Sequence, residues 1–114
     1  MPYISTHITT PLSKNAEISL KEKLGKAIAL LPGKSERWLM VEFQDNCRLY
    51  FQGKNDAPVA FVEVKAVGAI APEASEKLTA AICDMLEEEL SISPDHVYIK
   101  YESTDLWGWN GVNF

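Results

Sequence analysis

Polar and apolar residues alternate over residues 2–9, a pattern typical of a strand with one buried face. Residues 14–31 change to a helical spacing, and a strand-like pattern returns at residues 38–44. Pro32 and Gly33 end the helical segment, since neither residue continues a helix readily. The first half of the chain is therefore predicted to form a β-α-β unit. Its helix carries an apolar stripe of Leu20, Leu24, Ala27, Ile28 and Leu31.

The second half of the chain repeats the same order of patterns. It predicts a strand over residues 59–67, a helix over 72–90 and a strand over 96–102. Pro72 suits the first turn of this helix, because the N–H that proline lacks has no partner there in any helix. The apolar stripe of the helix consists of Leu78, Ile82, Met85, Leu86 and Leu90.

The two predicted units are related by a nearly constant offset, which indicates a duplicated β-α-β unit. Val59 follows Pro2 by 57 positions, and His96 follows Trp38 by 58. Two right-handed units can share one four-stranded sheet with both helices on the same face. We therefore predict an α+β fold that residues 1–114 form as one domain.

One face of this sheet is expected to stay uncovered by helices. In the third predicted strand, Val62 and Val64 alternate with Glu63 and Lys65, so only one face of the strand is apolar. The other face can meet water, a ligand or another subunit. The aromatic tail over residues 106–114 marks an interface or a ligand site, unless its rings pack against the chain's own sheet.

Composition and charge narrow the classes of partner. The net charge is −5 without a basic stripe, so nucleic acid is not an expected partner. No apolar run is long enough to span a bilayer, and we expect a cytoplasmic protein, with leaderless secretion left open. Cys47 and Cys83 are too far apart in sequence for a C-x-x-C pair and are interpreted as reduced thiols. The chain has no metal-binding or nucleotide-binding motif, so no cofactor is expected.

Pro2 is the first candidate for chemistry. If Met1 is removed, a secondary amine stands at the start of the first strand. Burial or a neighbouring cation lowers the pKa of such an amine by disfavouring its ammonium form, and a neutral amine can act as a general base. The alternative is that proline merely suits the first position of a strand, where no ladder hydrogen bond is needed.

Four segments of the chain together resemble one protein family. They are Pro2, Pro32-Gly33-Lys34, the run from Ser93 to Ile99, and Gly108-Trp109-Asn110-Gly111. In this order and at this spacing, the chain resembles the macrophage migration inhibitory factor (MIF) family of the tautomerase superfamily over its whole length. The resemblance implies the duplicated fold predicted above, assembled as a homotrimer with active sites at the subunit boundaries.

The resemblance also implies an activity, the keto-enol tautomerisation of arylpyruvates such as phenylpyruvate and of dopachrome derivatives. Pro2 would be the acid-base catalyst. Lys34 matches the family's lysine that binds the substrate carboxylate, although a cation at a helix C-terminus is also an ordinary structural feature. Tyr98 matches a tyrosine that the neighbouring subunit contributes to the pocket, and it is otherwise a strand aromatic.

Further positions match the family's substrate pocket. Val67, which precedes Gly68, would form part of the pocket wall. Trp38, Trp107 and Phe114 match a hydrophobic rim that packs against an aromatic ring, with a core strand residue as the alternative for Trp38. The same rim would keep water from the Pro2 amine. It would therefore both bind the aromatic ring of the substrate and lower the basicity of the amine.

The chain departs from the family pattern at several positions. Lys100 replaces an asparagine two positions beyond Tyr98, and we include it among the substrate-binding candidates because a second cation can strengthen carboxylate binding. Trp107 is bulkier than the aliphatic residue of the animal proteins. Residues 58–61 lack the C-x-x-C of members that act as thiol oxidoreductases, so that activity is not expected.

Two other functions stay open. Animal members of the family signal as cytokines through a receptor, so the chain can be a protein-binding module with incidental catalysis, although it carries no receptor motif. Hydration or dehalogenation of an unsaturated acid uses the same amine in the superfamily together with extra arginine and carboxylate groups. Arg37 and Arg48 are the only arginines, and the sequence assigns neither to the pocket, so tautomerisation is preferred.

Overall fold

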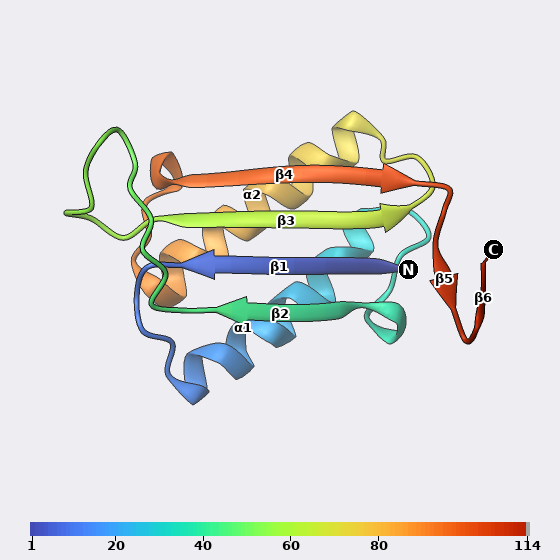
Figure 1. Ribbon diagram of the computed structural model, residues 1–114, viewed down its shortest axis with the longest axis horizontal. Helices are drawn as coiled ribbons and strands as arrows, with labels where there is room; N and C mark the ends of the chain where they lie inside the picture. The colour runs from blue at the N-terminus through green and yellow to red at the C-terminus, as the bar shows by residue number, and fades with distance from the viewer. Residues whose placement is uncertain (114) are drawn as a thin grey trace.

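The structure is a computed structural model that describes residues 1–113. Its centre is a four-stranded sheet with the strand order β2-β1-β3-β4 (Figure 1). The strands are β1 (Pro2–Ile8), β2 (Met40–Gln44), β3 (Ala60–Val67) and β4 (Val97–Thr104). β1 and β2 are parallel, as are β3 and β4, whereas the central pair β1 and β3 is antiparallel. This arrangement is the one expected of two β-α-β units joined along their first strands.

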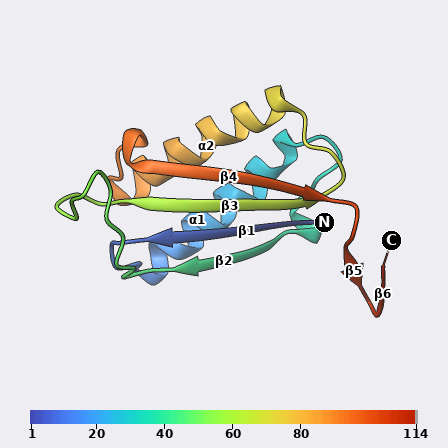
Figure 2. The ribbon, with the colours of Figure 1, turned by 45° about the horizontal axis from the view of Figure 1, so that its top comes forward.

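Both long helices cover the same face of the sheet (Figure 2). The helix α1 (Lys14–Ala27) begins after Ser13, whose hydroxyl accepts a hydrogen bond from the Ala16 N–H at 3.2 Å. The helix α2 (Pro72–Leu90) has proline in its first turn and ends at Ser91, which adopts a left-handed conformation. The predicted α+β fold with helices on one face is confirmed.

The core lies between the sheet and the helices. The inward residues of β1 and β3 are buried, and they meet the two apolar helix stripes that the sequence predicts. The side chains that are almost fully buried here include Ile4, Ile8, Val62, Val64, Leu20, Leu24, Ile28, Leu78, Ile82 and Leu86. This close packing holds the start of β1 firmly in place.

Several predicted boundaries differ from the observed ones. The first predicted helix continues as α-helix only to Ala27, and a short 3₁₀ turn, η1 (Ile28–Leu30), follows. Residues 36–38 form a second 3₁₀ turn, η2 (Glu36–Trp38), so Trp38 is not part of a strand as predicted. A third turn, η3 (Pro94–His96), precedes β4, which extends to Thr104. Short turns of this kind lack the length that makes a hydrophobic period visible.

The aromatic tail forms a small hairpin at the end of the sheet where β1 begins (Figure 1). Its strands are β5 (Gly108–Trp109) and β6 (Val112–Asn113), joined by Asn110 and Gly111, both with positive φ. An Asn-Gly pair suits this two-residue turn, because both positions require the left-handed region. Leu106, which is 82% exposed, and Val112, which is 66% exposed, show that much of this apolar surface is not packed on the chain's own sheet.

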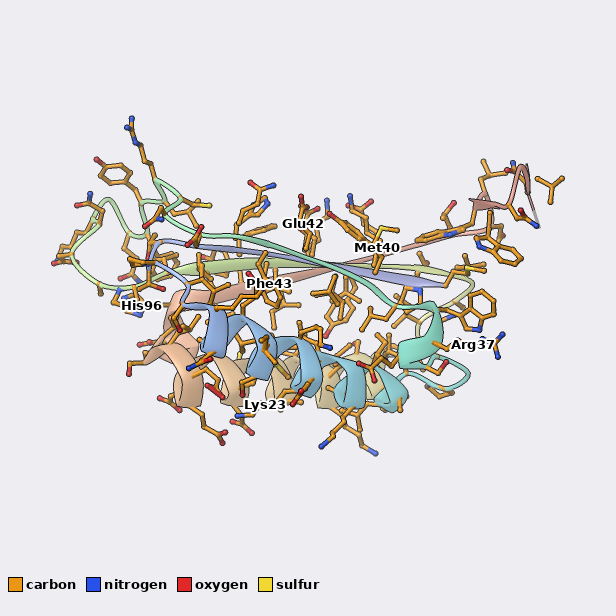
Figure 3. All side chains as sticks on the ribbon, turned by 90° about the horizontal axis from the view of Figure 1, so that it is seen from below. Lys23, Arg37, Met40, Glu42, Phe43 and His96 are labelled. Atoms are coloured by element: carbon orange, nitrogen blue, oxygen red, sulfur yellow. The ribbon has the colours of Figure 1, made fainter. Side chains whose placement is uncertain are left out.

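The other face of the sheet is open and polar. Figure 3 shows Met40 and Glu42 on the side of the sheet opposite the helices. Glu42 accepts hydrogen bonds from Tyr3 at 2.5 Å and from Ser5 at 3.3 Å, and Lys100 pairs with Glu102 at 3.2 Å on the same face. Over residues 1–113, neither helix is long and apolar enough to cross a membrane.

Candidate active site

A pocket of about 380 Å³ lies where β1 begins and the C-terminal hairpin approaches the sheet. Its residues come from the N-terminal segment, from η2 and the start of β2, and from the segment that contains β5. They are Met1, Pro2, Tyr3, Arg37, Trp38, Leu39, Met40, Trp107, Gly108 and Trp109. A concave, mostly apolar site of this size suits a small organic molecule.

Pro2 occupies the inner part of this pocket. It is the first residue of β1, pairs in register with Ala66 of β3 and is almost fully buried. Met1 is half-buried above it, and the Met1 carbonyl accepts a hydrogen bond from the Val67 N–H at 3.3 Å. Removal of Met1 would therefore place the amine of Pro2 in the pocket and free one backbone donor beside it.

The surroundings of the chain's amino group lower its basicity. Burial lowers the pKa of the Met1 amino group below its usual value, and the positive charge of Lys34 lowers this pKa further. After Met1 is removed, the free amino group is that of Pro2, and Lys34 lies near it through its hydrogen bond to Val67, the residue after the β3 partner of Pro2.

Lys34 reaches this site from the turn between α1 and η2. Gly33 has a φ of +80°, and the Lys34 N–H donates to the Leu31 carbonyl at 3.0 Å, which turns the chain back toward the sheet. The Lys34 ammonium then donates a hydrogen bond to the Val67 carbonyl at 2.7 Å. The structure thus brings Lys34 and Val67 together beside Met1, and two ammonium protons of Lys34 stay available to a ligand.

Three tryptophans form the aromatic wall of the pocket, and they are all the tryptophans of the chain. Trp38 and Trp109 pack edge to face, with their ring centroids 5.2 Å apart and their planes at 85°. Trp107 is half-buried at the same pocket. Trp109 was not among the predicted site residues, although the Gly108-Trp109-Asn110 segment that contains it was a clear sequence signal.

Arg37 also lines the pocket, which corrects the expectation that neither arginine belongs to it. Its guanidinium carbon lies 5.1 Å from the centroid of the Trp38 ring. Arg37 and Trp38 are consecutive residues of η2, and the tight turn directs both toward the pocket. Arg48, in contrast, lines a separate hollow among loop residues.

Tyr98 and Lys100 are not brought to this pocket within one chain. Tyr98 pairs with Phe61 in β3, five positions from the Ala66 that pairs with Pro2. At about 3.4 Å per strand residue this separation is about 17 Å. Tyr98 is 60% exposed and packs edge to face on Phe51, with the centroids 5.3 Å apart. Phe114, the last predicted site residue, lies outside the described residues.

The pocket thus combines a buried proline nitrogen, a cation beside it and an aromatic wall. Residues 1–113 contain no group of three His, Cys, Asp or Glu residues placed to hold a metal ion. With Met1 removed, the Pro2 nitrogen could exchange a proton with a bound acid, and Lys34 could hold a carboxylate.

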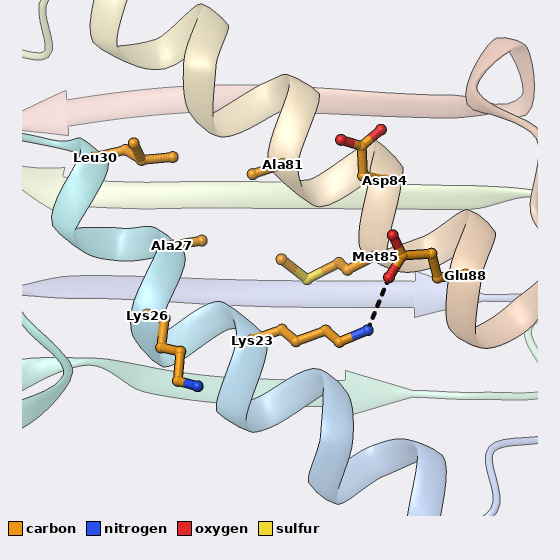
Figure 4. Close-up of a pocket in the computed structure, with 8 residues that line it drawn as sticks. All are labelled: Lys23, Lys26, Ala27, Leu30, Ala81, Asp84, Met85 and Glu88. Carbon is orange, nitrogen blue, oxygen red and sulfur yellow. Dashed lines mark hydrogen bonds and ion pairs between the residues drawn. The ribbon is translucent and has the colours of Figure 1, made fainter.

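A second hollow, of about 430 Å³, lies between α1 and α2 on the outer side of the helix layer (Figure 4). Its apolar floor is flanked by Lys23 and Lys26 on one helix and by Asp84 and Glu88 on the other. Lys23 pairs with Glu88 at 3.0 Å and with Glu89 at 3.1 Å, so it holds the two helices together. These ion pairs account for Lys23 and Glu88, two of the four charged residues that flank the groove.

Comparisons with known proteins agree on one family. The family model for macrophage migration inhibitory factor matches residues 1–114. The factor from Mus musculus is 30% identical over 100% of this chain and 99% of its own length. The crystal structure of MIF2 from Leishmania major is 32% identical, with a TM-score of 0.92 over 100% of this chain and 97% of its own. A homologue from Prochlorococcus marinus is also 32% identical, with a TM-score of 0.87 over 98% of both chains.

Proposed function

The chain belongs to the macrophage migration inhibitory factor family, and from this premise we propose that it is a cofactor-free keto-enol tautomerase of arylpyruvates. The observation that carries the proposal is the place of Pro2, almost fully buried at the start of β1 in an aromatic pocket. A proline that merely suits a strand end would not need Lys34 and three tryptophans around it. Phenylpyruvate is the simplest substrate with the required groups.

The proposed reaction moves one proton between carbon and oxygen. The neutral Pro2 amine removes a proton from the carbon next to the substrate carbonyl, and the electron pair of that C–H bond shifts toward the carbonyl oxygen. The resulting ammonium then returns the proton to this oxygen, which gives the enol, and the reverse sequence gives the ketone. Lys34 holds the substrate carboxylate, and the tryptophans pack against the aryl ring.

The proposed assembly is a homotrimer with a site at each subunit boundary. β2 and β4 are open edges of the sheet, and the hairpin exposes apolar side chains, so the chain has surface that a second copy can cover. Tyr98 lies about 17 Å along the sheet from Pro2. It can therefore contribute to catalysis only at the Pro2 of another copy.

Tyr98→Phe is expected to lower kcat/KM for phenylpyruvate by about threefold to tenfold, the usual effect of one neutral hydrogen bond. Steady-state kinetics with Tyr50→Phe as the control give the measurement, because Tyr50 is likewise exposed, at 69%, and lies in the loop after β2. Unchanged kinetics of Tyr98→Phe would contradict a role for its hydroxyl group, and equal losses in both variants would show a nonspecific effect.

The activity itself is tested with protein whose intact mass shows that Met1 is absent. We expect this protein to accelerate the interconversion of keto and enol forms of phenylpyruvate and 4-hydroxyphenylpyruvate, followed by the ultraviolet absorbance of the enol. A rate equal to the buffer background for both compounds would overturn the proposal. This result would favour a protein-binding module whose pocket does not catalyse tautomerisation.

A further inference from the structure

Arg37 is held at the pocket in a way that leaves its hydrogen-bonding edge available. Its guanidinium group lies 5.1 Å from the centroid of the Trp38 ring, and the Trp38 ring in turn packs edge to face with Trp109. Contact with an aromatic ring restrains a guanidinium group while its N–H groups can still bind a carboxylate with two parallel hydrogen bonds. Arg37 is exposed, so a ligand can reach it from the pocket opening.

Among residues 1–113, no negative charge competes for Arg37. None of the residues that line the pocket is acidic. The neighbouring Glu36 turns away, and its carboxyl group lies against Gly25 of α1, where a larger side chain would not fit. Among residues 1–113, no carboxylate forms an ion pair with Arg37. In a chain of net charge −5, this arginine is therefore an available cation at an otherwise apolar pocket.

Arg37 lines the pocket, whereas Lys34 is not one of the lining residues and lies beside the pocket near Met1. Lys34 is bound to the Val67 carbonyl beside Met1, whereas Arg37 shares the lining with the tryptophans. A ligand with a single carboxylate can satisfy only one of these cations fully. A ligand with anionic groups at both ends of an apolar body can satisfy both, and its body then lies against the aromatic wall.

We propose that Arg37 binds a second anionic group of the substrate, so that this chain prefers 2-oxo acids that carry a second carboxylate. The inference rests on the proposed function, because it takes Lys34 as the site of the first carboxylate. A phenylpyruvate with a carboxylate at the far end of its ring is the simplest compound of this class.

Binding can be measured apart from catalysis, because all three tryptophans of the chain line this pocket. Quenching of intrinsic fluorescence in Met1-free protein compares phenylacetate, with one carboxylate, and 4-carboxyphenylacetate, with two. We expect the dianion to bind about tenfold more tightly, consistent with one additional charged hydrogen bond at a partly exposed site. Arg37→Gln should bring the two dissociation constants to near equality, and Arg37→Lys should keep part of the preference.

Arg48→Gln is the matched control. Arg48 is the only other arginine of the chain, and it lines a separate hollow that contains none of the tryptophans. This variant should keep the wild-type preference. Equal dissociation constants of the wild-type protein for the two compounds would overturn the proposal. It would also be overturned if Arg37→Gln raised the two dissociation constants by the same factor. The fluorescence titration measures binding and does not require turnover of phenylpyruvate. A failure of the tautomerase proposal would appear in the kinetic assay instead, so the two failures can be distinguished.

The kinetic counterpart is the ratio of kcat/KM for 4-carboxyphenylpyruvate to kcat/KM for phenylpyruvate. We expect this ratio to be about ten in the wild-type protein and about one in Arg37→Gln, with the change mainly in KM. A loss of kcat with an unchanged ratio would show that Arg37 only supports Trp38, and it would also overturn the proposal.

Discussion

Replacing Pro2 with glycine is expected to lower kcat for phenylpyruvate tautomerisation by about 100-fold or more in protein that lacks Met1. The variant keeps an amino group at the same position but loses the ring that is almost fully buried at the start of β1. Without the ring, the nitrogen is no longer fixed at the carbon that must lose its proton. A misplacement of about 1 Å can by itself cost about 100-fold in rate.

Pro11→Gly is the control for this variant. Pro11 is exposed in the loop between β1 and α1, so its loss changes chain flexibility without touching the pocket. Steady-state rates and circular dichroism of both variants separate a catalytic effect from a loss of fold. An unchanged kcat in folded Pro2→Gly protein would rule out the Pro2 nitrogen as the base.

Lys34→Met is expected to have the second largest effect, because it acts on both substrate binding and the base. Loss of a charged hydrogen bond to the substrate carboxylate should raise KM by about 10-fold to 100-fold. The same change removes the positive charge that lowers the pKa of the Met1 amino group, and we expect its removal to raise the pKa of the Pro2 amine in Met1-free protein.

The direction of this pKa change predicts a shift in the pH dependence of activity. The base works in its neutral form, so activity is lost as the pH falls through its pKa. In Lys34→Met protein, the acidic limb of kcat/KM against pH should move to higher pH. Lys77→Met removes an equal charge from the exposed surface of α2 and should leave the limb in place. An unmoved limb in Lys34→Met would contradict the electrostatic role of Lys34.

The fold could be predicted largely from the sequence because its long elements follow clear hydrophobic periods. α2 was predicted with the observed bounds, and the buried positions of β1 and β3 follow the alternation of their residues. The 3₁₀ turn that contains Trp38 could not be predicted this way, because three residues are too few to show a period. Trp38 was therefore placed in a strand.

The pocket was predicted only in part, for a related reason. Pro2, Lys34, Val67, Trp38 and Trp107 do gather at one end of the sheet. Arg37 was missed because the direction of its side chain depends on the η2 turn. Its neighbour Glu36 points instead toward α1, and no sequence pattern distinguishes the two.

The positions of Tyr98 and Lys100 show a different limit of sequence reasoning. Both lie on the open face of β4. They pair with Phe61 and Glu63 of β3, whereas Pro2 of β1 pairs with Ala66 of β3, several residues further along. One chain therefore holds an incomplete version of the predicted site. Whether a side chain completes the pocket of another copy depends on assembly, which the pattern of residues along one chain does not specify.

The most direct test of the central claim compares two samples of the same chain that differ only in Met1. Without Met1, the chain begins with a secondary amine, whereas with Met1 the Pro2 nitrogen belongs to an amide and is not a base. We predict that kcat/KM for phenylpyruvate falls by at least about 100-fold when Met1 is retained, since general base catalysis is then lost. Equal rates from both samples, with intact masses confirmed, would contradict the claim that the Pro2 amine is the catalyst.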